Sequence, residues 1–195
     1  MKVLVVPALL IAAGLTAGCD RSIAASSDMS QDGHKTSNPA PSAVERGKYL
    51  VDAVGCHDCH TPKTMGKDGP ELDTSRLLAG RIATDQLPPP PPVQQGPWIV
   101  TGSWDLTAWS GPWGISYAVN LTPDQETGIG TWTEQMFVGA MKTGKHMGVS
   151  RPILPPMPWP AFRNLTDDDL KAMFAYLRTV PPIKNRVPDP VFASH

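Results

Sequence analysis

The chain has 195 residues, of which 41% are hydrophobic and 7% aromatic, and its formal net charge is −1. It contains no basic run and no nucleic-acid-binding motif, which argues against nucleic acid as a partner. The length suits one domain with appendages. The 22 prolines favour short helices and long ordered loops over a regular sheet.

Residues 1–18 are typical of a secretory signal peptide. Residues 3–13 form an apolar run that is too short for a comfortable membrane span. Residues 15–19, Leu-Thr-Ala-Gly-Cys, resemble a bacterial lipobox, in which the peptide is cut before the cysteine and the new N-terminus is acylated. We therefore expect Cys19 to be lipidated. The alternative is ordinary cleavage near Ala24, which would give a soluble periplasmic protein.

The segment 19–41 is rich in Ser, Asp, Gly, Asn and Pro, a composition that predicts a flexible tether behind the lipidated cysteine. Order is expected to begin at Ser42, which forms a capping box with Glu45. The apolar spacing predicts a helix that runs straight into Cys56. Gly47 is costly inside a helix, so it indicates either a close helix crossing or a merely tolerated glycine.

The pentapeptide 56–60, Cys-His-Asp-Cys-His, has the spacing of a c-type haem attachment motif. The thiols of Cys56 and Cys59 can each add to a porphyrin vinyl group, and His60 can supply the proximal ligand to the iron. A zinc site would need more ligands than one Cys pair supplies, and a thioredoxin-like pair would need a βαβ pattern. With Cys19 assigned to lipid, the three cysteines are accounted for and no disulfide is expected.

The middle of the chain gives weaker signals. Residues 65–97 show no convincing periodicity, and the five prolines at 88–92 predict a stiff polyproline surface loop. Residues 98–113 hold four tryptophans. These could line a haem pocket or a docking patch, but we favour the ordinary interpretation that they fill a core poor in other aromatic residues.

Two further helices are predicted. Thr131–Glu134 caps the first, whose apolar face ends at Gly144. The second starts at Thr166 and ends before Pro181. Its apolar stripe has helical spacing, and the segment 184–195 is expected to be an extended tail across the surface. The apolar faces of the two helices contain Met136, Phe137, Ala140, Met141, Leu170, Met173, Phe174 and Leu177.

A second iron ligand is predicted at Met157, which lies between prolines in a segment that suits neither a helix nor a central strand. A thioether on such a rigid strap can reach the open side of a haem iron. Met141 and Met173 lie on apolar helix faces, where methionine usually fills core space. The other rivals are the methionines at 65 and 147, and Met147 is the more serious because His146 lies beside it.

With these parts in place, the chain resembles a class I cytochrome c over residues 44–182. The specific motifs are 56–60, Asn-Leu-Thr-Pro at 120–123 with Thr-Gly-Ile-Gly at 127–130, and Met157 with its downstream segment. They resemble the monohaem units in cytochrome subunits of bacterial membrane-bound alcohol, aldehyde and gluconate dehydrogenases. Those subunits carry three haem motifs, whereas this chain has one.

The resemblance implies an all-α, class I cytochrome c-like fold at 42–183, with an insertion at about 68–119. It also implies one covalent haem c held by Cys56, Cys59, His60 and Met157. The predicted function is a periplasmic electron carrier rather than an enzyme, tethered to the inner membrane. It would pass single electrons from a dehydrogenase or respiratory donor to an oxidase or other acceptor. The alternatives are a haem sensor or small-ligand-binding protein with a displaceable methionine, and a non-catalytic dehydrogenase subunit.

Overall fold

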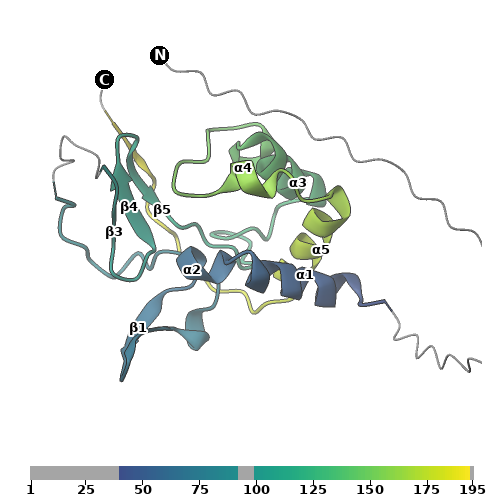
Figure 1. The fold of residues 1–195 in the computed structure, drawn as a ribbon, viewed down its shortest axis with the longest axis horizontal. Helices are drawn as coiled ribbons and strands as arrows, with labels where there is room; N and C mark the ends of the chain where they lie inside the picture. The colour runs from purple at the N-terminus through teal and green to yellow at the C-terminus, as the bar shows by residue number, and fades with distance from the viewer. Residues whose placement is uncertain (1–39, 92–98, 194–195) are drawn as a thin grey trace, which may run out of the picture. The chain divides into compact units, whose positions relative to one another are not determined.

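The computed structural model describes residues 40–91 and 99–193 (Figure 1). The predicted signal peptide, Cys19 and nearly all of the predicted tether lie outside the described residues. Helices and strands alternate with long loops in this part of the chain. The helices are α1 Ala43–Ala53, α2 Cys56–His60, α3 Glu134–Thr143, α4 Trp159–Phe162 and α5 Asp167–Leu177, with short 3₁₀ turns η1 Thr74–Arg76 and η2 His146–Gly148.

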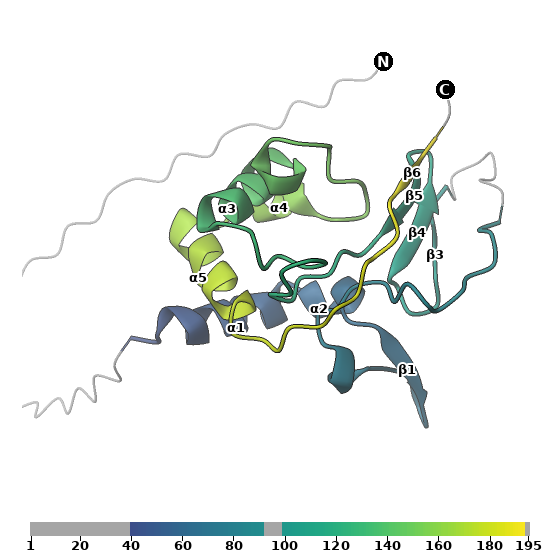
Figure 2. The same cartoon turned by 180° about the vertical axis from the view of Figure 1, so that it is seen from behind.

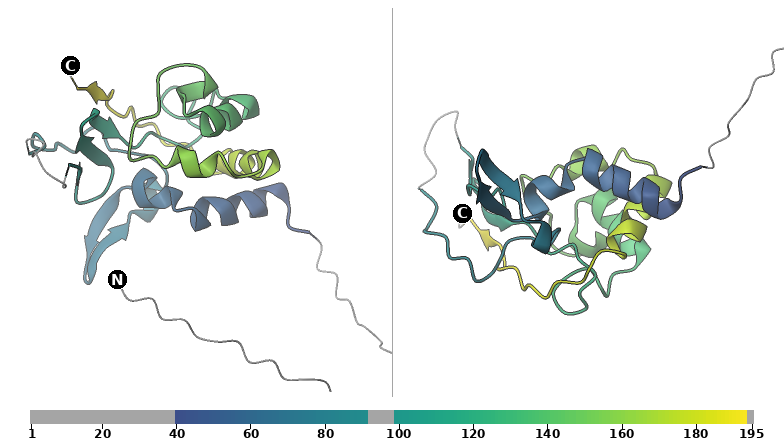
Figure 3. Two further views of the ribbon diagram at one scale, coloured as in Figure 1. Left: turned by 45° about the horizontal axis from the view of Figure 1, so that its top comes forward. Right: turned by 90° about the horizontal axis from the view of Figure 1, so that it is seen from below.

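The first and last helices, α1 and α5, pack against each other (Figures 1 and 3). The predicted capping box begins α1, since the Glu45 amide donates to Ser42 Oγ at 3.2 Å and the Ser42 amide donates to Glu45 Oε2 at 2.8 Å. A Cβ atom at Gly47 would lie 1.9 Å from the Ala172 carbonyl oxygen of α5. The close helix crossing predicted at Gly47 is therefore confirmed.

The helix α1 does not run straight into the Cys-x-x-Cys-His motif. It is capped at Val54, and Gly55 adopts a left-handed conformation with φ 75° before α2 begins. That conformation is costly for a residue with a side chain. The break allows the motif to form a separate helical turn with its own direction.

The other two predicted helices form, but within the predicted capping segment 131–134 the cap of α3 is Thr133, and the Thr131–Glu134 box does not form. The Met136 amide donates to Thr133 Oγ1 at the start of α3, and Gly144 ends that helix with φ 68°. The Asp169 amide donates to Thr166 Oγ1 at the start of α5. The buried core draws on α1, α3 and α5 and includes Leu50, Val51, Phe137, Ala140, Met141, Leu170, Met173, Phe174 and Leu177.

The expectation of an all-α fold is wrong in detail, because two small sheets accompany the helices. Strand β1 (Lys63–Gly66) pairs antiparallel with β2 (Gly69–Leu72). A second, antiparallel sheet has the order β3-β4-β5-β6, from Thr101–Gly102, Ala108–Gly111, Gly114–Tyr117 and Val191–Phe192. Strands of two to four residues are too short for alternation to be recognised in the sequence. Most of these strands lie within the predicted insertion.

The C-terminal segment is not only a surface tail. Asn185 is buried, and its Nδ2 donates to the carbonyl oxygens of Ala79 and Arg81 at 2.8 and 2.9 Å. Asn120 Nδ2 donates to the Ile183 carbonyl at 2.8 Å. Further on, β6 pairs with β5 (Figure 2). A polar residue without periodic neighbours carries no burial signal, so the sequence did not predict this role.

Within the part of the chain that the structure describes, no helix is both long and apolar enough to cross a membrane.

Candidate functional site

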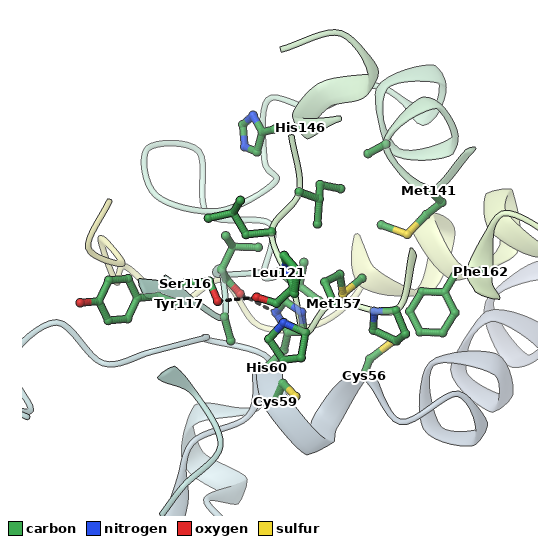
Figure 4. Close-up of a pocket in the computed structure, with 18 of the residues that line it drawn as sticks. Cys56, Cys59, His60, Ser116, Tyr117, Leu121, Met141, His146, Met157 and Phe162 are labelled. Carbon is green, nitrogen blue, oxygen red and sulfur yellow. Dashed lines mark hydrogen bonds between the residues drawn. The ribbon is translucent and has the colours of Figure 1, made fainter. Parts of the chain in front are cut away.

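The one-turn helix α2 presents the two thiols of the pentapeptide. Cys56 and Cys59 are three residues apart, which places them on the same face of the turn. Both line one cavity of about 370 Å³ (Figure 4). Glycine suits position 55 before this turn, because its φ of 75° is costly for a residue with a side chain.

The thiols are in surroundings that oppose ionisation. Burial, with smaller contributions from Asp52 and Asp58, raises the pKa of Cys56 to about 12. Burial also raises the pKa of Cys59, against the opposing effects of Lys63 and the Trp109 side chain. A redox-active pair of the thioredoxin type needs a lowered thiol pKa. This pair is therefore unlike a thioredoxin-type site.

The described residues also offer no group of three or more His, Cys, Asp or Glu side chains placed to hold a metal ion. The Cys pair thus has no further ligands of these types beside it in residues 40–91 and 99–193.

His60 is buried at 7% exposure and lines the same cavity. Its Nδ1 lies 2.8 Å from the Val119 carbonyl oxygen, which can only accept a hydrogen bond. Nδ1 therefore carries the proton, and in the neutral imidazole Nε2 keeps its lone pair. Burial lowers the pKa of His60 and so favours the neutral ring. The hydrogen bond to Val119 acts in the opposite direction but does not outweigh burial. A neutral, oriented imidazole is the form that binds a metal.

Met157 lies in the loop before α4 and lines the same cavity as His60 (Figure 4). The Ser116 hydroxyl of β5 donates to the Pro155 carbonyl oxygen at 2.6 Å. Two residues before Pro155, the Ile153 amide donates to the Gly144 carbonyl at 2.8 Å. The strap that carries the thioether, residues 153–158, is thus fastened at two points. The prediction of a methionine outside helices and strands is confirmed.

The rival methionines are placed differently. Met141 and Met173 are almost fully buried in the core and also line the cavity from α3 and α5. Met65 is 69% exposed on β1, and Met147 is not among the lining residues. His146 does line the cavity, with its ring edge-on to Trp132 at 5.0 Å between centroids. Of these two neighbours only His146 lines the cavity, and Met147 has a left-handed backbone conformation with φ 55°.

The tryptophans do not all fill the core. Trp104 is 53% exposed, so the favoured interpretation is wrong for it, while Trp109 lines the cavity. Trp113 Nε1 donates to Ser116 Oγ at 3.2 Å, beside the strap. Trp98 lies outside the described residues. The insertion therefore contributes to the cavity wall as well as to the surface.

Comparison with known protein families agrees with this geometry. The family model described as cytochrome c matches residues 44–181. This chain belongs to the cytochrome c family. Membership implies a class I cytochrome c-like fold and covalently attached haem c. The two small sheets are additions within that fold.

Three relatives of the chain are named as dehydrogenase subunits. It is 30% identical to a subunit of nicotinate dehydrogenase from Pseudomonas putida over 74% of its length, which is 9% of that relative. It is 30% identical to the fructose dehydrogenase cytochrome subunit of Gluconobacter japonicus over 76% of its length, which is 24% of that protein. It is 28% identical to the gluconate 2-dehydrogenase cytochrome c subunit of Pantoea cypripedii over 72% of its length, which is 24% of that protein. The chain thus spans at most about a quarter of the length of these relatives.

The residues of the cavity fit haem c. A buried thiol and a half-buried thiol three residues apart can form the thioethers, and His60 is held with Nε2 free to bind iron. A thioether on the fastened strap lines the same space. The rest of the lining is mainly apolar and aromatic, as a site for a large planar cofactor requires. It includes Leu121, Ile129, Trp132, Phe137, Phe162 and Leu177.

Proposed function

We propose that this chain is a single-haem electron carrier, with the cofactor attached through Cys56 and Cys59 and the iron bound by His60 and Met157. The observation that carries the proposal is that these four side chains line one cavity, although Met157 is far from the others in sequence. The cytochrome subunits among its relatives support electron transfer as the activity.

The bound haem would supply a single-electron centre that changes between ferrous and ferric states. The protein's own residues set its surroundings. The Val119 carbonyl fixes the ring plane and tautomer of His60 and raises the basicity of Nε2. The Ser116–Pro155 hydrogen bond holds the strap that presents Met157, a ligand that raises the reduction potential relative to a second imidazole.

The cellular setting is part of the same proposal. The predicted signal peptide and lipidated Cys19 would place the cytochrome in the periplasm, tethered to the inner membrane, and Asp20 resembles an inner-membrane retention signal. Its electron donor would be a dehydrogenase or a respiratory protein, and its acceptor an oxidase or another cytochrome. The relatives named as dehydrogenase subunits support a donor of this kind. The chain itself is proposed to be non-catalytic.

The experiment that tests the proposal is mass spectrometry on the exported protein, produced with a c-type maturation system. The peptide containing Cys56 and Cys59 should carry one haem through two thioether bonds. The ferric protein should show the long-wavelength absorption band of a thioether-bound haem. If the thiols are free and no porphyrin mass is present, the proposal fails.

The same preparation distinguishes the carrier from a small-ligand-binding haem protein. With both axial positions filled by the chain, the reduced protein should bind carbon monoxide slowly. Met157→Ala should retain the covalent haem, lower the reduction potential and bind carbon monoxide rapidly. Rapid binding by the unaltered protein, without the thioether band, would favour the sensor alternative.

A further inference from the structure

A second hollow lies against the four-stranded sheet β3-β4-β5-β6, on the side away from the proposed haem cavity. We call it the outer groove. It is bordered by the polyproline segment 87–91, by 101–104 around β3, and by residues of β4 and β5. The lining residues of β4 and β5 are Ala108, Trp109, Ser110, Ile115 and Tyr117.

The outer groove is mainly apolar, and the described residues that line it are uncharged. None of its lining residues is Asp, Glu, Lys, Arg or His. Across residues 87–118 the sequence contains one such residue, Asp105, which is buried and paired with Arg81 at 3.2 Å. Leu87 and Trp104 line the groove with 38% and 53% exposure. Exposed apolar patches of this kind mark interaction sites, and no described side chain at this surface offers a charge to a partner.

Two residues line both the outer groove and the proposed haem cavity, namely Trp109 of β4 and Tyr117 of β5. Their neighbours divide between the two spaces. Ser116 lines only the cavity, while Ile115 lines only the groove, as the alternation of side chains along a strand requires. Figure 4 shows the Tyr117 ring extending from β5 away from His60. The sheet is therefore a thin wall between the two spaces, and Trp109 and Tyr117 are the residues that line it on both sides.

The Trp109 ring is held in this position. Its Nε1 donates to the Leu106 carbonyl at 2.9 Å. Trp109 is paired with Gly102 across the sheet, and a Cβ atom at Gly102 would lie 3.0 Å from a ring carbon of Trp109. The missing side chain at Gly102 leaves the indole room to lie over β3. The indole therefore contributes to the groove as well as to the cavity that Cys59 lines.

We propose that Trp109 is the contact through which an electron passes between haem in the cavity and a redox partner seated in the outer groove, whose contacting surface is apolar and uncharged. This proposal rests on the proposed function. In the step, ferrous iron loses one electron and becomes ferric, while a one-electron acceptor of the partner is reduced. No covalent bond forms or breaks, and no proton moves.

The occupant is assigned from charge. A charged partner surface placed against this groove would lose hydration without gaining an opposite charge, whereas an apolar surface gains free energy from burial. The aromatic residues at the groove are also the type that dominates the binding energy of interfaces. In the proposal, Trp104 contributes binding energy for the partner and does not contact the haem, since it lines the groove and not the cavity.

The test uses the haem-loaded ferrous protein and two oxidants in stopped-flow measurements. Hydroxymethylferrocenium presents apolar rings, and ferricyanide is a hydrophilic trianion. Trp109→Leu and Trp104→Gln should each slow oxidation by hydroxymethylferrocenium roughly tenfold, the effect of losing one central aromatic contact, while ferricyanide reacts as before. Trp109→Phe, which keeps an aromatic ring, should remain close to the unaltered rate.

Three results would overturn the proposal in protein that keeps covalent haem and its thioether band. They are an unchanged hydroxymethylferrocenium rate in Trp109→Leu, equal slowing with both oxidants, and a Trp109→Phe rate as low as that of Trp109→Leu. If Trp109→Leu does not fold, Trp104→Gln decides, and either an unchanged hydroxymethylferrocenium rate or equal slowing with both oxidants in that variant would overturn the proposal. A dimer in sedimentation velocity that Trp104→Gln dissociates would assign the groove to a second copy and overturn the partner. Absence of haem would instead refute the proposed function.

Discussion

Replacing Ser116 with alanine should loosen the strap that carries Met157. The Ser116 hydroxyl is buried, donates to the Pro155 carbonyl at 2.6 Å and accepts from Trp113 Nε1 at 3.2 Å. Alanine removes both bonds and leaves a carbonyl and an indole N–H without this partner. In the closed state of the strap, Met157 binds the iron; in the open state, the strap has moved away. The two lost hydrogen bonds stabilise the closed state relative to the open one.

The magnitude follows from the two bonds. Leaving a partly buried polar group without its partner costs about 1–3 kcal/mol. If about 1–2 kcal/mol of this cost falls on the closed strap alone, the open fraction rises roughly 5- to 30-fold. An external ligand that binds the iron only in the open state should gain apparent affinity by the same factor.

The assay is a titration of the ferric protein with imidazole, followed by loss of the thioether band. Ser116→Thr keeps a hydroxyl and is the conservative control. Ser110→Ala is the matched control, because Ser110 is equally buried at 8% but lines the outer groove. If Ser116→Ala binds imidazole with the same affinity as Ser110→Ala, the hydrogen bond to Pro155 does not hold the strap and the reasoning is refuted.

Three further predictions concern stability and anchoring. Gly47→Val should lower the free energy of unfolding by about 3 kcal/mol or more in urea titrations, since its Cβ would lie 1.9 Å from a carbonyl oxygen of α5; a loss below about 1 kcal/mol would contradict the close crossing. Asp105→Asn should lower the free energy of unfolding by about 3 kcal/mol at neutral pH, because it leaves Arg81 without its buried partner. An unchanged midpoint of urea unfolding would contradict this. Burial would raise the pKa of Asp105, but hydrogen bonds from Ser103 and Thr107, together with the Arg81 charge, hold that pKa below its ordinary value. The stabilisation by ionised Asp105 is therefore fully present above the pKa that Asp105 has in the unfolded chain, and it is lost as the pH falls through its lower pKa in the folded protein. The Asp105→Asn variant should not show this loss when its stability is measured against pH. Cys19→Ser should move the protein from the membrane fraction to the soluble periplasmic fraction, and unchanged partition would argue against lipidation.

Much of the helical framework could be predicted because its signals are local. Ser42, Thr133 and Thr166 each lie at a helix start with a cap that satisfies free backbone N–H groups. Gly47 had no local reason to lie inside a helix, so a helix crossing was a sound interpretation of its presence. The Cys-x-x-Cys-His motif is equally local, since its chemistry requires a fixed spacing.

The contacts that complete the site could not be predicted, because they join distant parts of the chain through groups without a sequence signature. The partner of His60 is the backbone carbonyl of Val119, and any residue could supply it. Asn185 ties the C-terminal segment to the loop at 79–81 from a stretch without periodicity. The short strands of the insertion also lack a visible alternation, so a fold with two sheets was expected to be all-α.

The most direct test of the central claim is a proton–carbon NMR spectrum of the ferrous protein with its methionine methyl groups labelled with ¹³C. A methyl group bound through sulfur to the haem iron lies over the porphyrin face, and the ring current shifts its signal far upfield of the others. We expect one such signal among the methionine methyl groups, and its loss in Met157→Leu with covalent haem retained. A shifted signal that survives Met157→Leu, or disappears only when Met141 or Met173 is replaced, would contradict ligation of the iron by Met157.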